Sequence, residues 1–135
     1  VHGNALIAAK VRGDHVEERR HAEAALSISI RHGLKSIQCR NSSAYLVAID
    51  RTGSLAEMRE AAIRAESIAR EVGDLPVLGN VFNNASLCEF RAGNIVKAGK
   101  LSRTALNLAR TLKLRVAESA IRNRFGMIYA LLGRM

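Results

Sequence analysis

Glycines recur at an interval of 40 residues along this chain. One series consists of Gly13, Gly53, Gly93 and Gly133. A second series lies halfway between, with Gly33, Gly73 and, where a third glycine would fall, Lys113. A fixed period of this length is typical of stacked supersecondary units that pack against their neighbours. The spacing therefore predicts a repeat array, and arrays of this kind usually bind other molecules, so catalysis needs separate arguments.

The composition favours helices. Hydrophobic residues make up 48% of the chain and aromatic residues only 4%, and there is one proline and no tryptophan. A core built from such residues is aliphatic and rich in alanine, which is the best helix former. The regular alternation of β-branched residues that marks strands is missing. We therefore predict an all-α fold.

The repeat can be written in register as units 1–40, 41–80 and 81–120, with a partial unit over 121–135. We treat 1–135 as a single repeat domain and expect it to be a fragment of a larger protein. Each full unit contains two helical segments joined by links of two or three residues, which predicts antiparallel hairpins. The predicted helices span residues 2–12, 15–32, 35–52, 55–72, 75–92, 95–112 and 115–132.

The second helix of each unit carries the clearer pattern. Its apolar residues recur in steps of three and four, which places them on one helix face. In the second unit these residues are Leu55, Met58, Ala62, Ala65, Ala69 and Val72. In the third they are Ile95, Ala98, Ser102, Ala105, Ala109 and Leu112. Small residues at the middle of this face predict close approach of neighbouring helices.

Residues typical of helix starts precede most segments. Asp14 and Ser54 each stand three residues before a glutamate, which predicts a capping box. Asn94 keeps the cap residue without the glutamate, and Asp74 precedes Pro76 in the first turn. The glycines before these caps predict left-handed helix ends.

The pattern resembles the tetratricopeptide repeat. Gly126, Tyr129 and Gly133 stand at the spacing of that family's first helix and turn, and Ala98 and Ala105 fit the small residues of its second helix. The period of 40 is longer than the family's usual ~34 residues. The longer form is similar to repeats in large bacterial LuxR-type and antibiotic-regulatory transcription activators and some adenylate cyclases. The resemblance implies a right-handed α-α superhelix of about seven helices.

In this family the first helix of each hairpin lines the concave face, so the resemblance also implies a ligand-binding groove. Its candidate residues are Arg40, Ser43, Arg51, Asn80, Asn83, Phe90, Arg91 and Asn123. Asparagine can both donate to and accept from a peptide backbone, and arginine grips carboxylates with two hydrogen bonds. A peptide or an acidic protein segment therefore fits as ligand. The alternative is that these positions are simply solvated.

The net charge of +9 is unevenly distributed. Residues 81–135 contain ten basic and two acidic side chains, a balance that favours an acidic partner or a nucleic acid. No aromatic stacking platform accompanies these charges, which argues against nucleic acid. Lys97, Lys100 and Arg103 fall on a second helix, and a solvated outer face is the simpler interpretation.

We predict no catalytic residues, no metal site and no cofactor. The histidines lack metal-ligand spacing, and no glycine-rich phosphate loop is present. His15 and His32 occupy positions that are apolar in other units, which predicts packing roles. Two cysteines in separate repeats, Cys39 and Cys88, are interpreted as small buried residues in a reducing, cytoplasmic setting. No segment approaches the ~18 apolar residues of a membrane span, so no membrane association is predicted.

Both ends of the chain are expected to expose apolar side chains, because a solenoid buries each unit against the next. We therefore expect association with another copy through these ends. The residues concerned are Leu6, Ile7, Ala8, Ala9 and Val11 at the N-terminal end and Ile121, Phe125, Met127, Ile128, Tyr129, Leu131 and Leu132 at the other.

Three functions remain open at this point. The leading hypothesis is a protein- or peptide-binding repeat domain, the sensor or docking module of a bacterial signal-transduction or transcription-regulatory protein. The second is an architectural or oligomerisation spacer without a groove ligand. The third is nucleic-acid binding through the basic C-terminal half.

Overall fold

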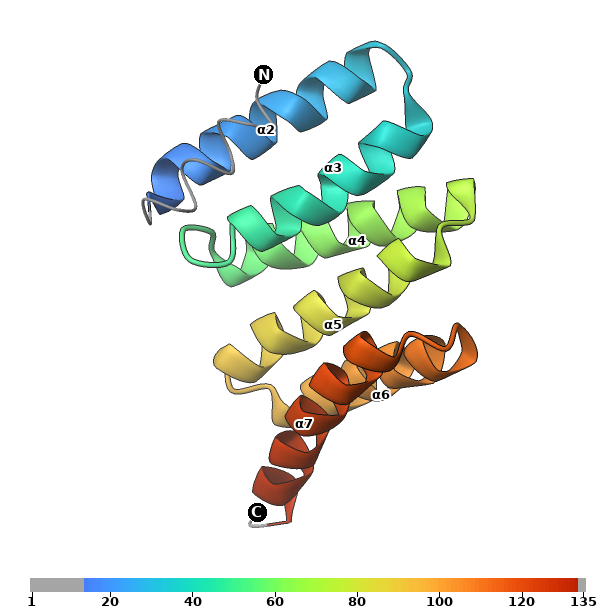
Figure 1. Cartoon of the computed structure of the whole chain (residues 1–135). Coiled ribbons are helices and arrows are strands. Elements are labelled where there is room, and N and C mark those ends of the chain that lie inside the picture. The colour runs from blue at the N-terminus through green and yellow to red at the C-terminus, as the bar shows by residue number, and fades with distance from the viewer. Residues whose placement is uncertain (1–13, 134–135) are drawn as a thin grey trace. The chain divides into compact units, whose positions relative to one another are not determined.

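The computed structural model describes residues 14–133, and these residues form six α-helices and no strand (Figure 1). The helices are α2 (His15–Arg31), α3 (Lys35–Ala48), α4 (Leu55–Val72), α5 (Leu75–Arg91), α6 (Ile95–Thr111) and α7 (Arg115–Leu132). The predicted all-α fold is confirmed. The helix expected over residues 2–12 lies outside the described residues.

The chain divides into two compact units between Gly73 and Asp74. The first unit contains α2, α3 and α4, and the second contains α5, α6 and α7. Within each unit, consecutive helices run in opposite directions and pack against one another (Figure 1). The expected hairpins are therefore present, whereas the superhelical path of the whole array stays a prediction.

Each unit has its own aliphatic core. In the first unit, Leu46 and Ile49 of the α3 segment are fully buried, as is Ala65 of α4. In the second unit, Val81 and Ile128 are 1% or less exposed. Most of the small residues predicted for the second helices are buried there, while Ala62 is only half-buried. The buried ones are Ala65 and Ala69 in α4, and Ala98, Ser102, Ala105 and Ala109 in α6. These residues let the backbones approach closely.

Helix α3 ends four residues earlier than predicted. The backbone N–H of Gly53 donates to the carbonyl of Ile49 at 2.7 Å, and that of Thr52 donates to the same oxygen at 3.2 Å. A Cβ at position 53 would stand 2.9 Å from this oxygen, so glycine is required by close packing rather than by a left-handed conformation. As a result, Arg51 lies in a turn and not in the helix.

The predicted cap residues are confirmed at α2, α4 and α5 and wrong at α6. Of the two predicted capping boxes, only that of Ser54 and Glu57 at α4 forms. At α2 Asp14 accepts the Glu17 N–H, but the Glu17 carboxylate pairs with Arg20 and His21 instead. Asp74 accepts one backbone N–H at the start of α5. Asn94 makes no cap hydrogen bond. Its Nδ2 instead donates to Glu89 Oε2 at 2.8 Å, because the buried carboxylate is the stronger acceptor nearby.

Left-handed backbone conformations occur at three of the described glycines of the two series, whereas the prediction is wrong for Gly53. Gly33, Gly73 and Gly93 have φ between 64° and 87°. Lys113, which replaces the third glycine of the second series, has φ 57° as well. The turn geometry is therefore maintained at a position where the sequence lacks glycine.

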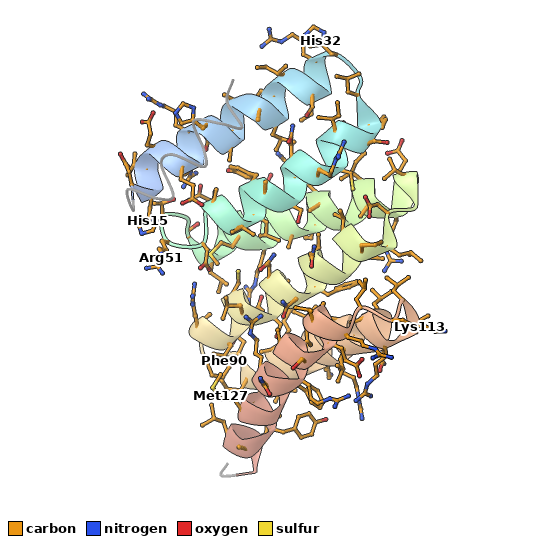
Figure 2. All side chains as sticks on the ribbon, viewed as in Figure 1. His15, His32, Arg51, Phe90, Lys113 and Met127 are labelled. Atoms are coloured by element: carbon orange, nitrogen blue, oxygen red, sulfur yellow. The ribbon has the colours of Figure 1, made fainter. Side chains whose placement is uncertain are left out.

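The burial predicted for two cysteines and two histidines is confirmed only for the cysteines. Cys39 and Cys88 are buried free thiols, as expected. His15 is half-exposed and His32 is exposed at the end of α2 (Figure 2), so the expectation that they pack in the core is wrong.

Candidate functional site

All eight residues predicted to contact a ligand are accessible. Arg40 and Ser43 lie on α3, and Arg51 lies in the following turn, where Figure 2 shows it at the edge of the ribbon. The other five lie in the second unit: Asn80, Asn83, Phe90 and Arg91 on α5, and Asn123 on α7. Ser43, Asn83 and Phe90 are half-buried and the rest are exposed. The rungs that were predicted to join Ser43 to Asn83, and Arg51 to Arg91, span the two units and stay predictions.

Within the second unit, α5 and α7 are each the first helix of a repeat, and they are hydrogen-bonded to each other at the predicted residue Asn83. Arg124 of α7 donates from Nη1 to the side-chain Oδ1 of Asn83 at 2.5 Å and to its backbone carbonyl at 3.2 Å. This charge-assisted contact is part-buried, which strengthens it. It brings the segment around Asn123 to Asn83 of α5. Arg124 was missed in the sequence, since arginines are frequent around it and nothing in the repeat distinguishes this one.

The first unit contains two adjoining hollows between α2 and α4, with α3 beneath them. One has a volume of about 120 Å³ and the other about 240 Å³. Both are lined by Leu26, Ser42 and Arg64. None of the eight predicted residues, all of which the structure describes, lines either hollow. The lining mixes apolar, neutral polar and charged side chains, so the hydrophobic periodicity of the sequence did not indicate these hollows.

An ion-pair network joins α2 to α4 at the edge of the smaller hollow. Arg19 Nη2 donates to Glu57 Oε2 at 2.5 Å, and Arg19 Nε donates to Glu23 Oε1 at 3.0 Å. The hydrogen bond from Arg19, supported by the backbone N–H of Ser54, lowers the pKa of the Glu57 carboxyl. Burial raises the pKa of the neighbouring Tyr45 phenol. Glu57 thus serves the capping box and the inter-helix pair together.

The turn between α6 and α7 is strongly basic. Arg110 and Arg122 both donate to the same oxygen of Glu118, at 3.2 Å and 2.6 Å. Lys113, labelled in Figure 2, and Arg115 are exposed beside them. On α6, Lys100 and Arg103 are exposed and form no ion pair with another described residue. One carboxylate shared by two arginines leaves this turn with excess positive charge.

Two further structural observations apply to residues 14–133. No group of His, Cys, Asp or Glu side chains is arranged there to hold a metal ion. None of the described helices is both long enough and apolar enough to cross a membrane.

The fold defines an all-α protein of consecutively paired helices, built on a 40-residue period. Comparison with known families found no family model that matches the chain, and comparison with curated proteins found no matching relative.

Proposed function

We propose that this chain is a protein- or peptide-binding helical-repeat domain of the tetratricopeptide-like class. The observation that carries the proposal is the contact between Arg124 and Asn83, which joins two first helices through a predicted polar position. Asn123, next to Arg124 in the chain, is exposed, and so is Arg91 at the end of α5. Neither side chain is part of the buried core of its unit, so both are accessible to a ligand.

The chemistry of this surface suits a polypeptide ligand. Asn83 uses its oxygen for Arg124, which leaves its Nδ2 to donate to a carbonyl of a ligand. Arg91 can grip a carboxylate of the ligand, and half-buried Phe90 can contact an apolar side chain. A peptide offers all three groups within a few residues.

The biological setting follows from the resemblance to the long repeats of bacterial regulators. We propose that the domain is a sensor or docking module of such a signal-transduction or transcription-regulatory protein. The basic turn between α6 and α7 favours an acidic partner, and it also supports nucleic-acid binding as a second candidate. A spacer without any ligand is the alternative that the following experiment excludes or supports.

The test compares partner capture from nuclease-treated bacterial lysate by the wild type and by the Arg51→Ala, Arg91→Ala double variant. A matched control, Arg70→Ala with Arg103→Ala, removes the same charge from exposed positions on second helices. We expect a protein partner that is retained by the wild type and the control and lost from the first variant. Equal capture by all three proteins, or none by any, would contradict the proposed surface.

A further inference from the structure

Helix α6 has a row of basic side chains on its exposed face. Lys100 and Arg103 lie three residues apart, and Arg110 lies seven residues further, spacings that place all three on one side of a helix. All three are exposed, and the row extends about 15 Å along the helix axis. The sequence of α6 contains no aspartate or glutamate, so no carboxylate of this helix neutralises the row.

A second row on α7 meets the first. Arg115, Glu118 and Arg122 lie three and four residues apart and therefore share a face of α7, on which both arginines are exposed. The two rows join at Glu118, because Arg110 Nε donates to its Oε1 at 3.2 Å and Arg122 Nη2 donates to the same oxygen at 2.6 Å. Lys113, in the turn between the two helices, is also exposed and points away from the ribbon (Figure 2).

These cations form a basic surface, which consists of Lys100, Arg103, Arg110, Lys113, Arg115 and Arg122. Residues 81–133 contain only two side-chain carboxylates to balance it. Glu118 is shared by two arginines, and buried Glu89 accepts from Asn94 while its Oε1 lies 3.4 Å from Lys97 Nζ. Four cations of the surface form no ion pair with another described residue: Lys100, Arg103, Lys113 and Arg115. The surface therefore attracts anions from solution.

We infer that this basic surface binds the phosphate backbone of a nucleic-acid duplex, independently of the base sequence. Phosphate oxygens in such complexes are bonded by Arg and Lys and also by Ser, Thr and Asn side chains. The neutral residues exposed beside the cations of α6 are of these types: Thr104, Asn107 and Thr111. A duplex has one negative charge per ~1.7 Å of its axis, so a row of about 15 Å lies against several phosphates.

An acidic polypeptide fits this surface less well. Protein interfaces depend on a few large side chains that become buried on binding. Between Lys100 and Thr111, α6 exposes no large apolar side chain. On α7, the exposed Val116 follows Arg115 directly, so it is turned by about 100° from the basic row. The two rows thus offer charge and hydrogen bonds without an apolar anchor.

The aromatic residues favour a duplex over a single strand. Proteins hold single strands by stacking the bases on aromatic rings that accompany the cations. No aromatic residue lies between the cations of either row. Tyr129 stands seven residues beyond Arg122, and its ring packs against that of Phe125 with 4.4 Å between the ring centroids. The paired bases of a duplex need no such rings.

This inference deepens the second candidate function, nucleic-acid binding, and shares no residue with the proposed peptide surface. The nuclease in the lysate experiment removes the ligand inferred here, so that experiment tests the peptide surface alone. The failure of one proposal is therefore distinguishable from the failure of the other.

The test measures the affinity of the full chain for a fluorescent DNA duplex of about 20 base pairs and arbitrary sequence, by anisotropy between about 50 and 200 mM NaCl. Lys100→Gln with Arg103→Gln removes two unpaired cations from α6, and Lys113→Gln with Arg115→Gln removes two from the turn and α7. The matched control, Arg31→Gln with Arg64→Gln, removes the same charge from exposed positions of the first unit.

Four phosphate contacts predict that the logarithm of the binding constant falls against the logarithm of the salt concentration with a slope of about −4. We expect a slope of about −2 and at least tenfold weaker binding at low salt for each surface variant, and the wild-type slope for the control. A duplex of scrambled sequence should bind equally well. Equal slopes for all variants, or no binding at about 50 mM salt, would overturn the inference. Tighter binding of the single strand, or of polyglutamate with the same number of charges, would overturn it too.

Discussion

Single residues set the turns of this protein, and Lys113 shows most directly how. It adopts the left-handed conformation that Gly33 and Gly73 adopt at the equivalent places of the period. A residue with a Cβ is strained there, by about 1–2 kcal/mol, whereas glycine is not. The turn is therefore imposed by the packing of α6 against α7, with a local loss of stability.

Lys113→Gly is expected to raise the free energy of unfolding by about 1 kcal/mol, because it relieves this strain. Gly73→Ala introduces the same strain in the other unit and is expected to lower the free energy by a similar amount. Urea unfolding monitored by circular dichroism measures both. Destabilisation by Lys113→Gly would show that the lysine side chain itself stabilises the turn.

Two serines of the second unit are expected to respond oppositely to the same substitution. Ser102 is fully buried, and its Oγ has no hydrogen-bond partner among the described residues. Ser86 is equally buried and donates to the carbonyl of Ala98 at 2.8 Å. Ser102→Ala should therefore raise the free energy of unfolding by about 1 kcal/mol, and Ser86→Ala should lower it by about as much. If urea unfolding shows Ser102→Ala to be the more destabilising of the two, the Ser102 hydroxyl does not destabilise the fold and the prediction is wrong.

At the scale of the helix, the spacing of the apolar residues predicted the helices that core packing stabilises. Helix α4 follows its predicted bounds, because the face with Met58, Ala65 and Ala69 and the Ser54 cap all agree. The end of α3 was not predictable. The helix ends there because Gly53 approaches the Ile49 carbonyl closely. In the sequence, Gly53 looks like any other glycine of the repeat, so this early end could not be read from it. The same limit applies to the candidate site: exposure of the first-helix residues followed from the register, whereas the Arg124–Asn83 pair depends on side-chain geometry.

The start of α6 gives a prediction that ordinary capping rules do not. Asn and Asp are about equally good cap residues. However, Asn94 donates to Glu89, whose side chain is only 3% exposed, and Asn94→Asp would set two carboxylates against each other. We expect a loss of about 1–3 kcal/mol at pH 7 that diminishes below about pH 4.

Urea unfolding of the Asn94→Asp variant at both pH values measures this loss. Asp74→Asn, at a cap that does bond the backbone, is the control and is expected to change the free energy by less than about 0.5 kcal/mol. A loss that is independent of pH would rule out repulsion between carboxylates as its cause.

The pair between Arg19 and Glu57 makes the contact of α2 with α4 sensitive to acid. The pKa of Glu57 is lowered in the folded protein from its ordinary value of 4.5, first by the hydrogen bond from Arg19. Its stabilising effect is therefore fully present above pH 4.5 and is lost as the pH falls through the folded-state pKa. The melting temperature of the wild type should fall more steeply below pH 4.5 than that of Glu57→Gln. Parallel curves would show that the pair contributes nothing to the pH dependence.

At the scale of the whole molecule, the effect of salt on binding separates two kinds of ligand. The C-terminal part holds ten basic and two acidic side chains, so it attracts polyanions of any kind, and salt screens that attraction. The proposed peptide surface of the second unit instead offers the Asn83 amide and the half-buried Phe90 ring. Binding there depends on shape and hydrogen bonds, which salt affects little.

The claim that the chain binds polypeptide is tested most directly by chemical-shift mapping of the full, isotope-labelled protein. The probe is the most strongly enriched peptide from a phage-displayed library of linear decapeptides selected on the full chain. It is titrated at low salt and at about 0.3 M NaCl, where exposed charges are largely screened. The account predicts saturable shifts that persist at the higher salt and cluster at the first-helix residues Asn83, Phe90 and Asn123. Shifts confined to Lys100, Arg103 and Lys113 that disappear at the higher salt would contradict it, as would the absence of any saturable shift.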